Sequence, residues 1–78
     1  MFEALETVVL TRALPEAGLE PGDVGAVVHC YPADGYEVEF VTGGGDTVAV
    51  LTLSETDLRP LAPQEILHAR GLARGRSA

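Results

Sequence analysis

The sequence contains no lysine and no tryptophan, and Cys30 is its single cysteine. One cysteine excludes an internal disulfide and fits a reducing cytoplasm, where a free thiol is tolerated. No apolar run approaches the roughly 18 residues that a membrane-spanning helix needs. The acidic start, with Glu3 and Glu6, differs from the positive start of a secretory signal peptide. We therefore expect a soluble, cytoplasmic protein without a membrane partner.

The chain has 78 residues, which predicts one small domain. A domain of this size buries only about 60% of the surface of its unfolded chain. Disulfides, metals or oligomerisation commonly supply the missing stability. The sequence offers no disulfide and no cluster of metal-ligating residues, so self-association is the source of stability that stays open.

The formal net charge is −7, and it is unevenly distributed. Residues 1–58 carry eleven acids and one base, Arg12, which gives −10, whereas residues 59–78 carry four arginines and one acid, which gives +3. An acidic body repels phosphate backbones, so nucleic acid is a poor partner for it. The basic segment suits an acidic surface, such as the body of a second copy.

Five segments have the β-branched or alternating composition of strands. The clearest alternation places Tyr36, Val38 and Phe40 on one face and Glu37 and Glu39 on the other. The first set predicts a buried face and the second a solvated one. The five predicted strands are residues 7–11, 24–31, 36–42, 47–53 and 58–61.

Turn residues separate these segments. Asp34-Gly35 is a strong signal for a hairpin, and Gly43–Asp46 predicts a second one. Ser54 with Asp57 three residues later predicts a capped turn of helix before the last strand. Gly25 lies inside a strand, which indicates close approach of a neighbouring backbone or coiling of the strand.

The C-terminal segment is predicted to be helical over Pro63–Leu72. Pro63 suits a first helical turn, and Ile66, Leu67 and Arg70 lie at helical spacings. We predict an all-β fold: a five-stranded, SH3-like antiparallel barrel with a short C-terminal helix. The barrel would span residues 1–62, and the helix with a frayed tail would span residues 63–78.

This layout of short strands, with a long first loop and two tight hairpins, resembles Src-homology-3-like (SH3-like) barrels. Residues 22–27 resemble the start of a KOW motif, found in ribosomal and transcription-elongation proteins. Residues 5–60 resemble a family of small stand-alone bacterial domains of uncharacterised function, DUF4926, which has no assigned chemistry. The features that carry this resemblance are Val8-Val9-Leu10-Thr11, Leu14-Pro15, Gly22-Asp23-Val24-Gly25, Tyr36-Glu37-Val38-Glu39-Phe40 and Leu58-Arg59.

No group of residues in the sequence forms a catalytic, cofactor-binding or metal-binding site. A cysteine–histidine pair can form a nucleophile, but His29 and Cys30 are neighbours on a strand and point to opposite faces. We interpret Cys30 as a small core residue. Gly43–Gly45 lacks the Lys-Ser/Thr and the helix of a phosphate loop, so we interpret it as a turn.

We therefore predict a non-enzymatic protein-interaction or accessory module. One version is an antitoxin- or immunity-like protein, because small acidic proteins can bind basic sites. The alternative is a KOW-like protein that binds RNA or ribosomes through its basic C-terminal segment. A cysteine enzyme is a third hypothesis, and no cofactor or small-molecule substrate is indicated. The predicted partner-binding residues are Tyr31, Glu37, Glu39, Leu67 and Arg70.

Overall fold

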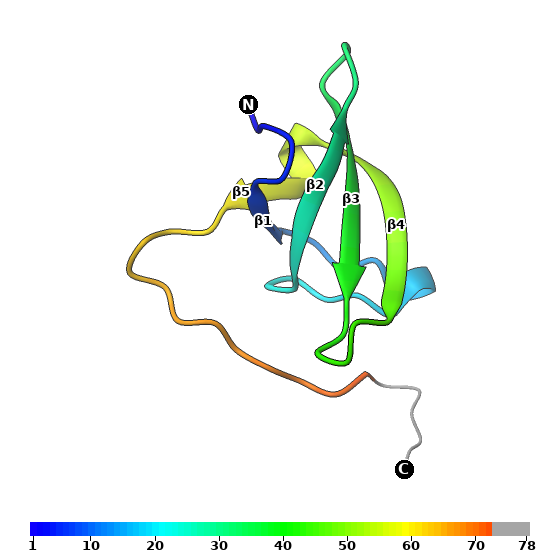
Figure 1. Cartoon of the computed structure of the whole chain (residues 1–78), viewed down its shortest axis with the longest axis vertical. Coiled ribbons are helices and arrows are strands. Elements are labelled where there is room, and N and C mark those ends of the chain that lie inside the picture. Colours follow the sequence, from blue (N-terminus) through cyan, green and yellow to red (C-terminus); the bar gives the residue numbers. More distant parts are fainter. Residues whose placement is uncertain (73–78) are drawn as a thin grey trace.

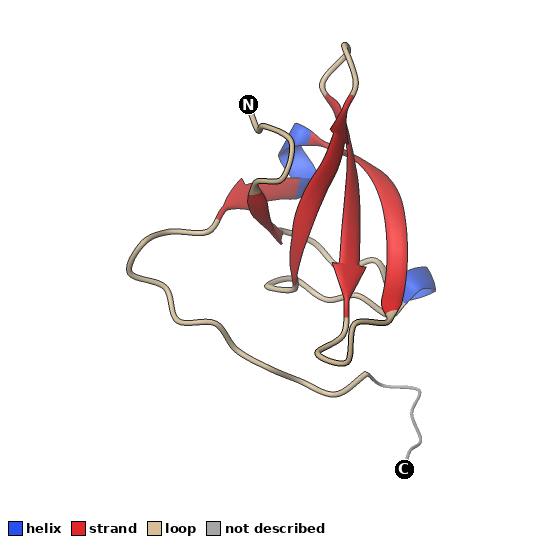
Figure 2. Ribbon diagram, in the orientation of Figure 1, coloured by secondary structure: helices blue, strands red, loops and turns tan. Residues whose placement is uncertain are grey.

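Five antiparallel β-strands are the main elements of the computed structural model, which describes residues 1–72 (Figure 1). Two short 3₁₀ turns interrupt the strands, and the described residues contain no α-helix (Figure 2). All five predicted strands are present, with ends shifted by at most one residue. The all-β class is therefore confirmed. The elements are β1 (Thr7–Leu10), η1 (Pro15–Ala17), β2 (Val24–Cys30), β3 (Gly35–Val41), β4 (Thr47–Ser54), η2 (Glu55–Asp57) and β5 (Leu58–Pro60).

The strands form one sheet in the order β4-β3-β2-β1-β5, and every neighbouring pair is antiparallel. The first strand lies inside the sheet, where Val8 is opposite Gly25 of β2 and Val9 is opposite Arg59 of β5. Within residues 1–72 the outer strands β4 and β5 do not pair with each other, so the sheet is open. The five-stranded antiparallel sheet is confirmed, and the closed barrel is not.

The core lies on one face of the sheet, because alternate side chains of a strand point to opposite faces. Tyr36, Val38 and Phe40 of β3 are at most 4% exposed, as their alternation with Glu37 and Glu39 predicts. The long first loop contributes Leu14 and Leu19, which a short antiparallel bridge holds together. The other residues of this core are Phe2, Val8, Leu10, Val27, Leu53 and Leu58, and Val9 is buried outside it.

The turns follow the predicted chemistry. Asp34 has a φ of +63° in the hairpin that joins β2 to β3, a left-handed conformation that aspartate tolerates better than most residues. Ser54 and Asp57 form a capping box around η2, in which the Ser54 amide donates to the Asp57 carboxylate at 3.0 Å. This box satisfies amides that a helix start leaves without partners. The capped turn predicted from Ser54 and Asp57 is confirmed.

The prediction of a C-terminal helix over Pro63–Leu72 is wrong. Residues 61–72, here called the strap, contain a single turn and otherwise extended coil (Figure 1). The Arg59 guanidinium donates two hydrogen bonds to Glu65, at 2.8 and 2.7 Å, and Arg70 contacts the first loop near the other end of the strap. A helix of about ten residues is marginal in water, so these contacts suffice to select the extended path.

The prediction that Cys30 is a core residue is also wrong, because the side chain is exposed. The pairing of β2 with β3 shifts register between Val27 and His29. After this shift Cys30 is opposite Tyr36, as the last residue of β2. Beyond this residue the strand continues into the hairpin that projects from the sheet (Figure 1). Cys30 therefore lies past the edge of the core.

Gly25→Ala should lower the free energy of unfolding by about 1–3 kcal/mol, as overpacked core positions do. An added Cβ would lie 2.9 Å from both Phe40 Cε2 and Val38 Cγ1, and 3.0 Å from the Glu39 carbonyl oxygen. Urea denaturation measures the change. The matched control is Gly43→Ala, where nothing lies within 4 Å and the change should stay below about 0.5 kcal/mol. Equal stability of the two variants would contradict this account.

Candidate functional site

The solvent-facing side of β2, β3 and β4, here called the outer face, carries three of the predicted partner-binding residues. Glu37 is opposite His29 of β2 and Thr52 of β4. Glu39, two residues along, is opposite Ala26 and Val50. Because the intervening Val38 is fully buried, the two carboxylates must project from the same side of the sheet. The alternation that builds the core therefore also places these acids in one row.

Tyr31 is fixed on the outer face by two neighbours. Its hydroxyl donates a hydrogen bond to Glu37, and its ring packs edge-on against His29, with 4.6 Å between ring centroids. The hydrogen bond to the Glu37 carboxylate raises the pKa of Tyr31 above its ordinary value of 10.0. The ring is still 39% exposed. An aromatic residue held in this way offers contact area to a partner at little entropic cost.

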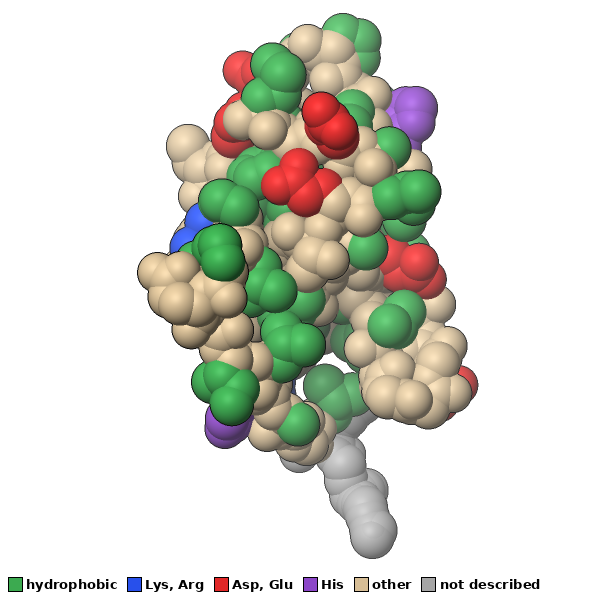
Figure 3. All heavy atoms as spheres, turned by 60° about the vertical axis from the view of Figure 1, so that its left-hand side comes forward, with side chains coloured by type: hydrophobic (Ala, Val, Ile, Leu, Met, Phe, Trp, Pro, Cys, Tyr) green, Lys and Arg blue, Asp and Glu red, His purple; other side chains and the backbone are tan. Residues whose placement is uncertain are grey.

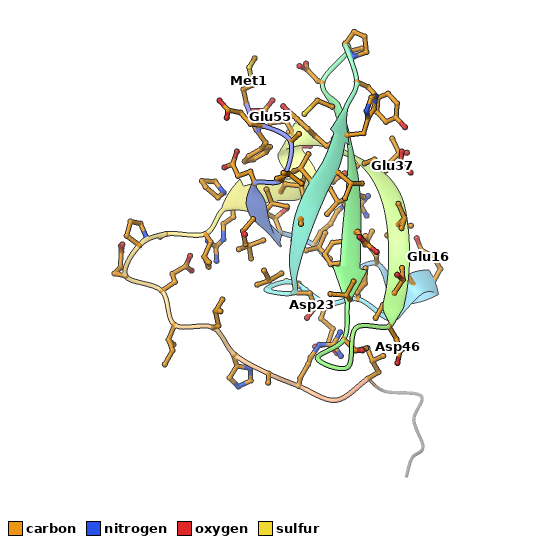
Figure 4. All side chains as sticks on the ribbon, viewed as in Figure 1. Met1, Glu16, Asp23, Glu37, Asp46 and Glu55 are labelled. Atoms are coloured by element: carbon orange, nitrogen blue, oxygen red, sulfur yellow. The ribbon has the colours of Figure 1, made fainter. Side chains whose placement is uncertain are left out.

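Apolar side chains lie between the acids of the outer face. Val50 and Val41 are 45% and 53% exposed, and Glu39 accepts a hydrogen bond from the Thr47 hydroxyl at 2.9 Å. Figure 4 shows Glu37 beside the upper part of β4 and Asp46 at its lower end. Carboxylates interspersed with exposed valines suit the rim and centre of a binding surface.

The reactive groups on β2 do not converge. The Cys30 thiol contacts the Phe2 carbonyl oxygen at 3.6 Å, whereas the His29 ring contacts Tyr31. Among residues 1–72, no three histidine, cysteine, aspartate or glutamate side chains are arranged to hold a metal ion.

Arg70 lies at a second place, the lower end of the sheet, where the strap crosses the first loop. Its guanidinium donates to both Asp23 oxygens, at 2.9 and 2.6 Å, and to the Gly18 carbonyl at 2.9 Å. These bonds lower the pKa of Asp23 below its ordinary value of 3.8. Leu67, 66% exposed, lines the same end of the molecule. Arg70 is thus engaged within the chain, and Leu67 is available to solvent.

A groove of about 760 Å³ lies between the strap and the body of the protein. Leu19, Val24, Phe40 and Val41 form the wall on the body side, and residues 67–72 form the other wall. The structure thus separates the predicted site residues into two places. Tyr31, Glu37 and Glu39 lie together on the outer face, and Leu67 and Arg70 lie beside the groove. Nothing in the sequence pattern relates Arg70 to Asp23, because 47 residues separate them.

Every arginine in the described part of the chain has a carboxylate partner. Arg12 pairs with Asp57, Arg59 with Glu65 and Arg70 with Asp23, and the Arg59 guanidinium lowers the pKa of Glu65 to about 2. In the view of Figure 3, acidic side chains appear at several places and basic ones only at the left edge. The basic charge within residues 1–72 is therefore neutralised, and the acidic charge is in excess.

The comparisons with known proteins identify one family. Residues 4–60 match the family described as a domain of unknown function (DUF4926). The match begins before β1, ends with β5 and excludes the strap. No curated protein and no solved structure matches the chain. Within residues 1–72 there is also no helix with the length and apolar character needed to cross a membrane.

Glu37→Gln should lower the pKa of Tyr31 toward 10.0, because it replaces the charged acceptor of the tyrosine hydroxyl. Tyrosinate absorbance measured against pH in a Tyr36→Phe background follows Tyr31 alone. Since folding raises this pKa, the stabilisation is fully present below pH 10 and is lost as the pH rises through the folded-state value. Glu39→Gln removes the same charge two residues away and should leave the pKa unchanged. An equal shift in both variants would contradict a specific Tyr31–Glu37 contact.

Arg70→Gln should loosen the strap and raise the pKa of Asp23 toward 3.8. Carboxyl chemical shifts followed during an NMR titration measure the pKa, and limited proteolysis measures access to residues 61–72. The sign follows from the lowered pKa: the stabilisation is present above pH 3.8 and is lost as the pH falls through the folded-state value. Arg12→Gln, which breaks the pair with Asp57, should leave cleavage of the strap at the wild-type rate. Equal cleavage in all three proteins would show that Arg70 does not hold the strap.

Proposed function

We propose that the chain, which belongs to the DUF4926 family of domains of unknown function, is a non-enzymatic module that binds a basic protein partner. One observation carries the proposal: Glu37 and Glu39 project side by side from the outer face, with Tyr31 fixed against Glu37 and Val50 exposed beside Glu39. Acidic groups around exposed apolar and aromatic contacts are the composition of a protein-binding surface.

The charge of the whole chain supports a basic partner. The net charge is −7, and the arginines of the described residues are paired internally. Such a surface attracts a basic protein at long range and accelerates association. An antitoxin- or immunity-like role is the concrete version that we favour, in which the outer face covers a basic site on a second protein. The free, exposed thiol of Cys30 is compatible with the reducing cytoplasm, where we place this function.

The proposal includes an SH3-like architecture. The strand order β4-β3-β2-β1-β5 and the 3₁₀ turn between β4 and β5 support it, because a partly open barrel of this kind needs its first strand between the second and the last. In SH3-like barrels an exposed aromatic groove binds proline-rich peptides. Here Tyr36 is 4% exposed and Tyr31 is turned onto Glu37, so we assign binding to the acids and not to an aromatic groove.

RNA binding remains the alternative hypothesis and receives no support from residues 1–72. Arg70 is bound to Asp23 and Gly18. Arg74 and Arg76, the other two arginines on which that hypothesis depends, lie outside the described residues. Counterion release requires unpaired cations next to phosphates, so the acidic outer face is the stronger basis for a function.

The test is affinity capture from cells that encode the protein, with the purified wild-type chain and two double variants as baits. Glu37→Gln/Glu39→Gln removes two charges from the outer face. Glu3→Gln/Glu16→Gln removes two charges from outside it. We expect the wild type and the second variant to retain a basic protein. The first variant loses two exposed charge pairs, and each contributes about 0.2–1 kcal/mol, so we expect its affinity for that protein to fall about tenfold.

The captured protein is identified by mass spectrometry and then purified for direct titration against all three baits. Retention that is equal on both double variants would show that the outer face is not the binding surface. Turnover of a small molecule by the purified chain, lost on changing Cys30, would replace the proposal with an enzymatic one.

A further inference from the structure

The two edges of the sheet differ in how they are protected. The edge formed by β5 has three residues, Leu58–Pro60, and these include a charged arginine and a proline. Short edge strands with charges or prolines resist pairing with other chains. The edge formed by β4 has eight residues, with the sequence TVAVLTLS. It is long and contains no charge and no proline, and its one irregularity is a register shift at Val48, outside the stretch that holds Val50 and Thr52.

The backbone of β4 has a free side. Its pairing with β3 runs from Thr47 to Ser54, and this uses the hydrogen-bonding groups that point toward β3. Within residues 1–72 no backbone hydrogen bond joins the opposite side of β4 to another segment. In Figure 1 this strand lies at the outer border of the sheet. A row of backbone donors and acceptors is therefore open to an added strand.

We infer that the partner proposed above binds by adding an extended basic segment to the free edge of β4. This inference rests on the proposed function and specifies the form and chemistry of the partner. Backbone hydrogen bonds to β4 supply the part of the affinity that does not depend on the partner's sequence. The side chains on the two faces of the added strand supply specificity.

The outer face determines the first half of the partner's pattern. Residues of the added strand on this face would lie beside Val50 and Thr52, which are opposite Glu39 and Glu37. Strands are spaced about 4.8 Å apart, so the added strand lies about 10 Å from β3. A lysine or arginine covers that distance by laying its stem over Val50 or Thr52 and placing its charge near Glu39 or Glu37. Alternate residues of the partner strand are therefore basic.

The core-facing side of β4 determines the other half of the partner's pattern, the residues that alternate with the basic ones. Ala49 and Leu51 point inward from β4 and are partly buried against the core. Inward residues of the added strand would extend this apolar row, so they are expected to be β-branched or otherwise apolar. The partner segment thus alternates basic and apolar residues.

A second copy of the chain matches this edge less well. If two β4 strands paired antiparallel about Val50, Asp46 at one end would face Ser54 and Glu55 of the other copy. This arrangement would bring like charges together at both ends of the interface, between two chains of net charge −7. Asp46 at the lower end of β4 (Figure 4) has the opposite effect on a basic strand, which it attracts.

The test uses a synthetic capped peptide of alternating lysine and valine, of the same length as β4, titrated into the full chain. A control peptide has the same composition with lysines and valines in separate blocks. We expect the alternating peptide to bind at least about tenfold more tightly, since only it can place every lysine on the outer face. Hydrogen exchange should show new protection in β4 and none in β5, and raising the salt concentration should weaken binding.

Two lysine variants, at valines that are similarly exposed, compare a charge on the edge strand β4 with the same charge on an interior strand. Val50→Lys places a like charge on β4, and Val28→Lys places the same charge on the interior strand β2; the wild-type valines are 45% and 42% exposed. We expect Val50→Lys to weaken binding of the alternating peptide by about fivefold, and Val28→Lys by at most about twofold. The surface variant Glu37→Gln/Glu39→Gln should weaken it by roughly tenfold.

Specific outcomes would overturn the inference. If Glu37→Gln/Glu39→Gln weakens binding while the alternating and block peptides bind equally and hydrogen exchange shows no new protection in β4, the outer face binds but the edge does not. In that case the proposed function stands and edge pairing fails. If Glu37→Gln/Glu39→Gln and Val50→Lys both bind the alternating peptide as tightly as the wild type, both the proposed function and edge pairing fail. Self-association through β4 that strengthens with salt would replace the basic partner with a second copy.

Discussion

The close approach of β2 to β3 at Gly25 is the contact on which the rest of the structure depends. Atoms of Phe40 and Val38 lie 2.9 Å from where a β-carbon on residue 25 would be, so these two side chains of β3 pack directly on the backbone of β2. The same contact fixes the register in which Ala26 is opposite Glu39. That register determines both which residues of β3 fill the core and which project from the outer face.

The strands could be predicted from the sequence, because each is short, bounded by turn residues and carries its own pattern. Residues 36–40 alternate so strictly that both the core and the row of acids follow from them. The strap could not be predicted: its path depends on Arg70 reaching Asp23, a tertiary contact that overrides local helical preference. Cys30 was misplaced for a related reason: it is the last residue of β2, opposite Tyr36 and next to the hairpin, and the extent of the core at that end does not follow from the residue types of the strand.

The candidate site shows a similar division. Glu37 and Glu39 were identified from their spacing alone, but the role of Val50 depends on its being opposite Glu39 in the sheet. The lack of charge in β4 is visible in the sequence, yet it has a meaning only once the strand is known to lie at an edge. A small all-β protein with one buried face uses most of its residues for the core and turns. Its remaining surface, here acidic and partly apolar, is where we propose that a partner binds.

The attachment of the strap has a consequence for the lifetime of the protein. Arg70 is the described residue through which the strap is hydrogen-bonded to the first loop, and the strap forms one wall of the groove that Leu19, Val24 and Phe40 line at the lower end of the sheet. Release of this one side chain would present a protease with an extended segment and quality-control factors with an apolar surface at the same time. Proteolysis that starts at the strap would then require only this local opening and not global unfolding.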